Sequence, residues 1–187
     1  MNVRHIRIQG RSIAIGALLG ASLVVAGQQV GRISWLPVAA PVELAQLVIR
    51  RDAKGDGHFG APRSGNVAHR GVDIEAPLGS SVLAIRSGRV IMTGRHRGRG
   101  LYLELDHGRG LRSLYAHLQT IEVDTGDLVR QGQRIGTVGK TGNARHPLIV
   151  PHLHLEVSSA GALVDPSSLG LTLVDRLEES SDAIGGN

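Results

Sequence analysis

Two histidines lie two residues apart in the segment His152-Leu153-His154-Leu155-Glu156-Val157. Residues two apart in a β-strand share a face, so a strand here would place His152, His154 and Glu156 on one side and three aliphatic residues on the other. Two imidazoles on one face, backed by an apolar face, suit a metal site or an acid–base site. Taken alone, the pair is also compatible with two surface histidines on an edge strand.

A second pair of chemically active residues is His69 and Asp73, which lie four residues apart around Gly71. The glycine lets the chain bend, so the imidazole and the carboxylate could converge on one ion. Both groups are zinc ligands, and a catalytic zinc typically has three protein ligands and one position open to water. His69, Asp73 and one histidine of the 152/154 pair would supply that set. Taken alone, Asp73 could instead be a capping or salt-bridging residue.

A third candidate is His117, at the end of a strand-like run in Tyr115-Ala116-His117-Leu118. On its own it could be an ordinary polar residue.

The chain contains no cysteine, which excludes a disulfide scaffold, a thiol nucleophile and a cysteine-liganded zinc. A metal site in this protein must therefore use histidine and carboxylate, and the three elements together are hard to explain as coincidence.

Short apolar runs that alternate with glycine must position these side chains. Each run has the length of a strand, and glycine, aspartate or asparagine closes it, as is usual between strands. None keeps a helical period of 3.6 residues for about ten residues. We therefore predict an all-β fold, a single compact domain of short antiparallel strands packed as a sandwich or barrel. The runs are Val82–Ile85, Arg89–Met92, Leu101–Leu105, Leu111–Ala116, Arg134–Val138 and His152–Val157.

The N-terminus has the composition of an export segment. Arg4, Arg7 and Arg11 precede an apolar run over residues 13–27. A basic region followed by an apolar run of this length, ending in small residues, is typical of a secretory signal. We predict that residues 1–27 are either a cleaved signal peptide or an uncleaved anchor that tethers the protein to a membrane. A buried N-terminal helix is the alternative.

Changes in composition divide the rest of the chain. We expect a linker at 28–52 with a short amphipathic helix over Pro41–Arg51, a compact domain at 53–170, and an acidic flexible tail at 171–187. Basic residues gather in Arg95-His96-Arg97-Gly98-Arg99, which is either a solvated turn or a rim contact for an anionic polymer. No nucleic-acid partner is expected, because the chain has an export segment, four aromatic residues and no recognition-helix pattern.

Five motifs of the chain occur in the order seen in the lysostaphin/LytM-like zinc metallopeptidases, and the sequence is similar to that family from about Gly57 to Pro166. The Asp165-Pro166 pair resembles the closing motif of the family. The five motifs are His69–Ile74, Ala84–Val90, Leu114–Leu118, Gly126–Gly136 and Pro151–Val157.

The resemblance implies a lysostaphin-type all-β domain with a substrate groove and one Zn²⁺ at its floor. It implies that His69, Asp73 and His154 are the zinc ligands, and that His117 and His152 are catalytic histidines beside the metal. The family cleaves peptide bonds in the cross-links or stems of bacterial peptidoglycan, so the expected location is the bacterial cell envelope. Few aromatic residues are available to stack on sugars, so recognition should rest on the peptide and not on the glycan.

Two segments depart from the family pattern. Residues 143–150 replace a short turn before Pro151 and are longer and more apolar, which changes the expected groove wall. The segment Gly57–Arg63 resembles the family only loosely. Relatives that lack zinc ligands act as non-catalytic wall-binding regulators that activate another hydrolase, and such a regulator is the alternative function. A further alternative is a latent enzyme, which binds the metal but has its groove blocked by the linker or by residues 143–150.

Overall fold

The computed structural model describes residues 37–176, which lie in one compact unit that begins at Pro37. The predicted export or anchor segment, residues 1–27, and the start of the predicted linker lie outside the described residues. Within residues 37–176, no helix is long and apolar enough to cross a membrane.

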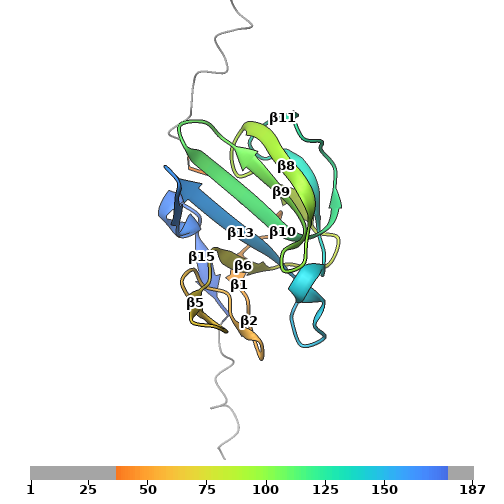
Figure 1. Cartoon of the computed structure of the whole chain (residues 1–187), viewed down its shortest axis with the longest axis vertical. Helices are drawn as coiled ribbons and strands as arrows, with labels where there is room; N and C mark the ends of the chain where they lie inside the picture. The colour runs from red at the N-terminus through yellow and green to blue at the C-terminus, as the bar shows by residue number, and fades with distance from the viewer. Residues whose placement is uncertain (1–36, 177–187) are drawn as a thin grey trace, which may run out of the picture. The chain divides into compact units, whose positions relative to one another are not determined.

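The described chain is built from strands and two 3₁₀ turns, in agreement with the predicted all-β fold (Figure 1). The elements are β1 Leu47–Ile49, β2 Arg51–Asp52, β3 Gly55–Asp56, β4 Pro62–Arg63, β5 Val67–Ala68, β6 Val72–Glu75, β7 Ser81–Leu83, β8 Gly88–His96, β9 Gly100–Asp106, β10 Leu111–Ile121, β11 Leu128–Val129, β12 Arg134–Val138, η1 Gly142–Arg145, β13 His152–Ser159, β14 Ala162–Val164, η2 Pro166–Leu169 and β15 Leu173–Asp175.

One 11-stranded sheet organises the domain. Its main path runs β11-β8-β9-β10-β13-β6-β1-β15, while β12 pairs with β10 and β7, and β14 pairs with β13. In Figure 1, β10 and β13 cross the middle of the domain side by side. Strand pairs in the sheet are antiparallel except β1 with β15, which is parallel.

The two faces of β13 have different roles. Leu153, Leu155 and Val157 are fully buried in the hydrophobic core, where they pack with the aliphatic side chains of the neighbouring strands. Because side chains alternate along a strand, His152, His154 and Glu156 face the other way. The apolar face thereby anchors the strand that presents the polar one.

The predicted helix over Pro41–Arg51 is wrong. Residues Leu47–Ile49 form β1, which pairs with β6 through Ile49 and Ile74, and Val42 makes an isolated bridge to Val82. Leu47 and Ile49 are buried while Val48 is only half-buried, which is strand alternation. The β-branched residues of this stretch gain more from the exposed edge of β6 than from a helix.

The predicted flexible tail is wrong for its first part. Leu171 is buried, and Leu173–Asp175 forms β15 beside β1. Arg176 forms an ion pair with Glu75 of β6. Residues 177–187 lie outside the described residues. Segments on both sides of the predicted 53–170 domain are therefore parts of its sheet.

Candidate metal centre

Three neighbouring strands bring the predicted metal ligands together. His154 of β13 lies opposite Asp73 of β6 on one side and opposite Ala116 of β10 on the other. His69 lies just before β6. All three predicted ligands are buried, and their ligand atoms lie within 4.8 Å of one another.

The ligand atoms form a small triangle. Oδ1 of Asp73 is 2.7 Å from Nδ1 of His154 and 3.2 Å from Nε2 of His69, and the two ring nitrogens are 3.1 Å apart. Zinc bonds of 2.0–2.1 Å in a tetrahedron place ligand atoms about 3.3 Å apart, so the triangle fits one face of such a site. Two imidazoles and one carboxylate are also a suitable donor set for zinc.

Outer contacts orient both imidazoles toward this triangle. Nδ1 of His69 donates to the carbonyl oxygen of His58 at 2.7 Å, which leaves the lone pair on Nε2. Nε2 of His154 donates to Glu156 at 3.3 Å, so Nδ1 is the ring nitrogen that faces the triangle, where it can hold either a proton shared with Asp73 or a metal ion. Such contacts to the far nitrogen of a ligand histidine fix its tautomer and strengthen it as a ligand.

Carboxylates set the electrostatics around His154. Burial by itself lowers the pKa of this imidazole, but hydrogen bonds to Asp73 and Glu156 raise the pKa to about 9. Glu156 is in turn held by Nη2 of Arg99, 3.1 Å from both carboxylate oxygens. The negative charge that favours a proton at this position also favours a metal cation.

The second oxygen of Asp73 is held by two arginines. Arg50 donates to Oδ2 from Nη2 at 2.9 Å and from Nε at 3.3 Å, and Arg63 donates from Nη2 at 3.3 Å. Arg50 is buried, and its Nη1 lies 2.7 Å from Oδ2 of Asp52. Burial alone would raise the pKa of Asp73, but the hydrogen bonds from His154 and His69 hold it well below its usual value. Asp73 is therefore an anion with Oδ1 directed at the two imidazoles.

Gly71 has a different role from the one that its spacing indicated. Its φ angle is not in the left-handed region, so it does not make a special bend. A Cβ at this position would lie 2.2 Å from the carbonyl oxygen of Leu155. The glycine thus allows the chain before β6 to approach the backbone of β13, which brings His69 and Asp73 next to His154.

The two predicted catalytic histidines lie beside the triangle. The His117 ring centroid is 4.9 Å from that of His152 and 5.8 Å from that of His154. Nδ1 of His117 donates to the carbonyl oxygen of Thr141 at 3.0 Å, and Nδ1 of His152 donates to that of Val150 at 2.7 Å. Both rings therefore keep Nε2 free of a proton, and Nε2 of His152 lies 3.8 Å from Oδ1 of Asp73.

Burial keeps both of these histidines neutral. It lowers the pKa of His152 and, with the nearby His152 and His154 rings, lowers the pKa of His117 to about 3. A neutral imidazole with a free Nε2 is a proton acceptor at physiological pH. The site thus combines a cation-binding triangle with two bases.

A break in β10 sets the direction of His117. The pairing of β10 with β9 shifts between Tyr115 and Leu118, and His117 has a φ of 63°. Bulges of this kind redirect a side chain and are common beside active sites. A non-glycine residue at positive φ costs of order 1–3 kcal/mol, so the surrounding contacts must hold it. The Thr141 carbonyl is one such contact.

The segment that carries Thr141 is held by close backbone contact. Its Oγ1 accepts from the backbone N–H of Leu101 and donates to the carbonyl oxygen of Leu118. Gly142 has a φ of 66°, and a Cβ there would lie 2.2 Å from the carbonyl oxygen of Gly98. The unusual segment at 143–150 therefore begins at a fixed point beside His117, and η1 forms its first part.

The structure adds Glu156 and Arg50 to the residues that the sequence singled out. Glu156 shares the histidine face of β13 by strand alternation, so the spacing contained this signal. No signal for Arg50 exists in the sequence, because it depends on β1 pairing with β6. Within residues 37–176, the remaining histidines contribute no ligand atom to this cluster. His58 contributes only its carbonyl oxygen, while its ring contacts Asp56 and Asp175.

The fold and the site together define a class of protein: small β domains that hold a histidine–carboxylate cluster on one face of a sheet, beside neutral histidines. Residues 67–166, more than half of the chain, match the peptidase family M23, and the chain belongs to this family. The resemblance to lysostaphin/LytM-like peptidases is thereby confirmed.

Two relatives differ in activity. The peptidoglycan DD-endopeptidase ShyB of Vibrio cholerae is 35% identical over 114 residues, which are 61% of this chain and 26% of the relative. The murein hydrolase activator EnvC of Escherichia coli is 36% identical over 108 residues, 58% of this chain and 25% of the relative. The chain thus spans about a quarter of the length of these relatives.

Solved structures agree with the fold. A zinc-containing peptidase from Vibrio cholerae shares 34% identity with a TM-score of 0.57, covering 70% of this chain and 39% of that chain. The catalytic domain of lysostaphin from Staphylococcus simulans shares 33% identity with a TM-score of 0.53, covering 63% of this chain and 90% of that chain. The predicted lysostaphin-type fold is therefore confirmed.

Proposed function

We propose that this protein is a zinc-dependent endopeptidase that hydrolyses peptide bonds in the cross-links or stems of peptidoglycan. The observation that carries the proposal is the triangle of His69, Asp73 and His154 beside two neutral histidines. Membership of a peptidase family and the similarity to a DD-endopeptidase support the reaction class. Similarity to a zinc-containing peptidase supports the metal.

In this proposal His69 Nε2, Asp73 Oδ1 and His154 Nδ1 hold one Zn²⁺. Zinc bound there supplies a Lewis acid for the scissile carbonyl and lowers the pKa of a bound water toward about 7. His117 and His152 are the proton carriers, because each ring lies beside the triangle, each has Nδ1 engaged by a backbone carbonyl, and each has a pKa that keeps it neutral. One accepts the proton of the attacking water, and the other, once protonated, stabilises the oxyanion or protonates the leaving amine.

Arg50 and Glu156 support this chemistry by holding two of the ligand side chains. Arg50 holds Oδ2 of Asp73, so that Asp73 offers one oxygen and not two. Glu156 accepts the far proton of His154. Contacts of this kind typically change metal affinity or activity by about 10–100-fold when they are removed.

The alternative function is a non-catalytic regulator that activates another wall hydrolase, as the name of EnvC describes for that relative. The cluster of metal-binding side chains argues against it, because a regulator needs neither the triangle nor the two neutral histidines.

We also propose that the protein works in the bacterial cell envelope. It would reach the envelope through the export segment at 1–27, which is either cleaved or retained as a tether.

Digestion of purified peptidoglycan by the full chain tests the function. Samples contain added zinc or a chelator, beside His154→Ala and the matched surface variant Arg130→Gln. We expect new amino termini only in the zinc-loaded wild type and in Arg130→Gln. Equal release by His154→Ala would contradict the site. Binding of wall without release in any zinc-loaded sample would instead favour the regulator.

A further inference from the structure

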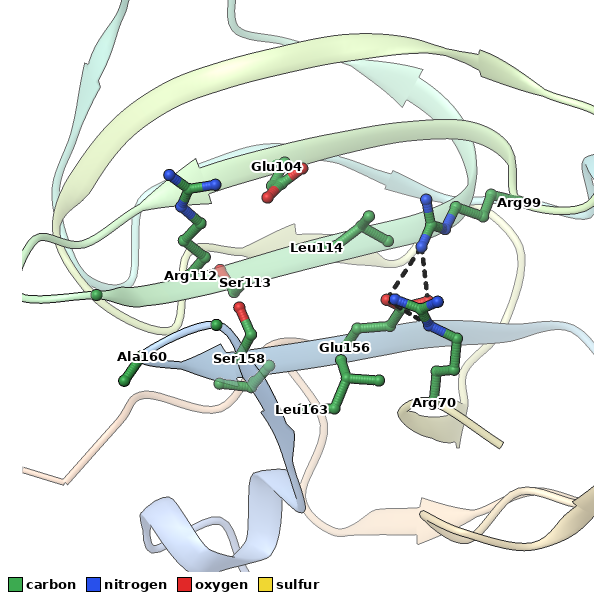
Figure 2. A pocket seen from close by; sticks show the side chains of 13 residues that line it. Arg70, Arg99, Glu104, Arg112, Ser113, Leu114, Glu156, Ser158, Ala160 and Leu163 are labelled. Atoms are coloured by element: carbon green, nitrogen blue, oxygen red, sulfur yellow. Dashed lines mark hydrogen bonds and ion pairs between the residues drawn. The ribbon is translucent and has the colours of Figure 1, made fainter. Parts of the chain in front are cut away.

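A cavity of about 570 Å³ lies directly beyond the metal centre on the polar face of β10 and β13 (Figure 2). It begins at Glu156, which contacts His154, and it extends along both strands toward Ser158. The pairing of β10 with β13 sets the order: Ala116 lies opposite His154, Leu114 opposite Glu156, and Arg112 opposite Ser158. The cavity is thus a continuation of the metal site along the strand direction.

Three arginines line this cavity against two carboxylates. Arg70 and Arg99 approach Glu156 from opposite sides at one end of the cavity, and Arg112 lies at the other end, beside Ser113 (Figure 2). The second carboxylate is Glu104. The lining therefore carries one more positive than negative charge, and His154 and Arg99 already engage Glu156.

Within residues 37–176, two of the arginines have donors that no side chain engages closely. The Arg70 side chain is 58% exposed and reaches Glu156 only at 3.6 Å, from Nε. The Arg112 side chain is 52% exposed and reaches Asp106 only at 3.8 Å, also from Nε. Neither contact uses the two Nη groups, which are the groups that bind a carboxylate in pairs.

The length of the cavity matches an extended peptide. Four residues of β10 separate Ala116, opposite the metal ligand, from Arg112, which corresponds to about 14 Å at 3.4 Å per residue. A peptide with its scissile bond at the metal could extend over Leu114 and Leu163 and reach Arg112 about four residues away. An apolar floor with charges at both ends suits a chain that carries acidic groups at its ends or side chains.

We propose that this cavity is a carboxylate-binding subsite, which selects peptide substrates with a free carboxylate on the Glu156 side of the scissile bond. Arg112 and Arg70 are the specificity-determining residues, and Arg99 holds Glu156 in place at the end near the metal site. The proposal rests on the proposed peptidase function, since it assigns the part of the substrate beside the metal.

The test uses matched substrates that differ only in charge. Cross-linked stem peptides released from peptidoglycan are used in two forms, with free carboxylates and with the same groups converted to carboxamides. The ratio of kcat/KM for the acid to that for the amide measures the preference. We expect wild type to prefer the acid and Arg112→Gln or Arg70→Gln to lower this ratio roughly tenfold each. Arg112→Lys should lower it less, because it keeps the charge.

Arg130→Gln is the matched control. It removes one positive charge from an exposed turn between β11 and β12 and should leave the ratio unchanged. High salt should reduce the wild-type preference and have little effect on Arg112→Gln. A wild-type enzyme that cleaves both peptides equally would overturn the subsite while the peptidase function stands. So would Arg112→Gln and Arg70→Gln variants that both retain the full preference.

Binding without turnover separates the two proposals. The same peptides are titrated by calorimetry into the full chain with chelator present. Tighter binding of the acid form, lost in Arg112→Gln, would support the subsite even if the zinc-loaded protein cleaves neither peptide, and in that case only the peptidase function fails. Equal binding of both forms to the wild type would overturn the subsite.

Discussion

Strand β10 lies beside two buried histidine networks of opposite design. At its start, His107, which follows β9, contacts Ser113, and Ser113 contacts Tyr115. In its middle, His117 lies beside the cluster of His69, Asp73 and His154. Both networks are buried, and both depend on long-range contacts between strands. Their difference is in where the polar atoms point.

The network around His107 is internally satisfied. Nδ1 of His107 contacts the carbonyl oxygen of Ser87 at 3.1 Å, and Nε2 contacts Oγ of Ser113 at 2.7 Å. Ser113 continues to the hydroxyl of Tyr115, which also accepts the backbone N–H of Ile85 at 2.9 Å. Every polar atom of this network has a partner within the protein, so it serves stability and has nothing left to bind with.

The candidate metal centre directs its ligand atoms at a common point. The far nitrogens of His69 and His154 are engaged, which leaves Nε2 and Nδ1 to face Oδ1 of Asp73. Two ring nitrogens and a carboxylate oxygen that face one another suit a cation, which is either a proton on the imidazoles or a metal ion. Convergence of ligand atoms, and not the number of histidines, therefore separates the candidate binding site from a structural network.

Loss of a ligand should give the largest contrast between the two networks. We expect His69→Ala to lose bound zinc and peptidoglycan hydrolysis, because two ligands do not hold a catalytic zinc. His107→Ala should keep its zinc but unfold more easily. Metal analysis after dialysis and denaturant titration measure the two effects. Full zinc occupancy in His69→Ala would remove it from the ligand set.

The two histidines beside the triangle should affect catalysis and leave metal binding intact. His117→Gln and His152→Gln should each lower kcat by about 10²–10⁴-fold, since each removes a proton carrier. Zinc content should match the wild type in both. A variant that loses zinc as well as activity would instead show that its histidine supports the metal.

Arg50 lies outside the region that matches the family and should still affect the metal. Arg50→Lys keeps the charge but loses the two-point contact with Asp73, so we expect zinc affinity to fall about 10–100-fold. Competition with a chromogenic chelator measures it. Arg51→Lys is the control, because Arg51 pairs with Asp56 at the exposed surface. If Arg50→Lys and Arg51→Lys bind zinc with equal affinity, the contact of Arg50 with Asp73 contributes to folding stability and not to metal binding.

The satisfied network should respond as a structural one. Tyr115→Phe removes the acceptor of the Ile85 N–H in the core and should lower the free energy of unfolding by about 1–3 kcal/mol. Zinc content and hydrolysis below the unfolding transition should stay at wild-type levels. Activity lost in the folded variant would show that the two networks are coupled through β10.

The smallest effect should be the dependence of stability on pH at His107. Burial lowers the pKa of His107 from its usual value near 6.5. Above that pH both states are neutral. As the pH falls below it, the unfolded chain binds a proton that the folded chain does not, so stability is lost with a slope of at most about 1.4 kcal/mol per pH unit. Urea titrations between pH 7 and 5 should show a shallower loss for His107→Gln; parallel curves would contradict the assignment.

Strand alternation made part of this architecture predictable. The apolar runs predicted as strands correspond to β7, β8, β9, β10, β12 and β13. These strands were predictable because one face of each packs on the core, which leaves a regular pattern of apolar residues in the sequence. The same alternation placed His152, His154 and Glu156 on one face. It did not predict β1 or β15, because β1 forms only where β6 leaves an edge to pair with, and β15 forms only where β1 does. Local patterns in Pro41–Arg51 favoured a helix, and pairing between distant strands overrode them.

The sequence by itself determined the all-β fold class, the family and the candidate metal ligands. These depend on residue types and on the two-residue alternation of side chains along a strand. The tertiary structure decided which histidines converge and which are already satisfied, and it brought Arg50 to Asp73 and the three arginines to one cavity. The physical reason is that convergence depends on the register between strands far apart in the chain, on close backbone contact at Gly71 and on the break in β10 at His117. None of these is a local property of the residues concerned.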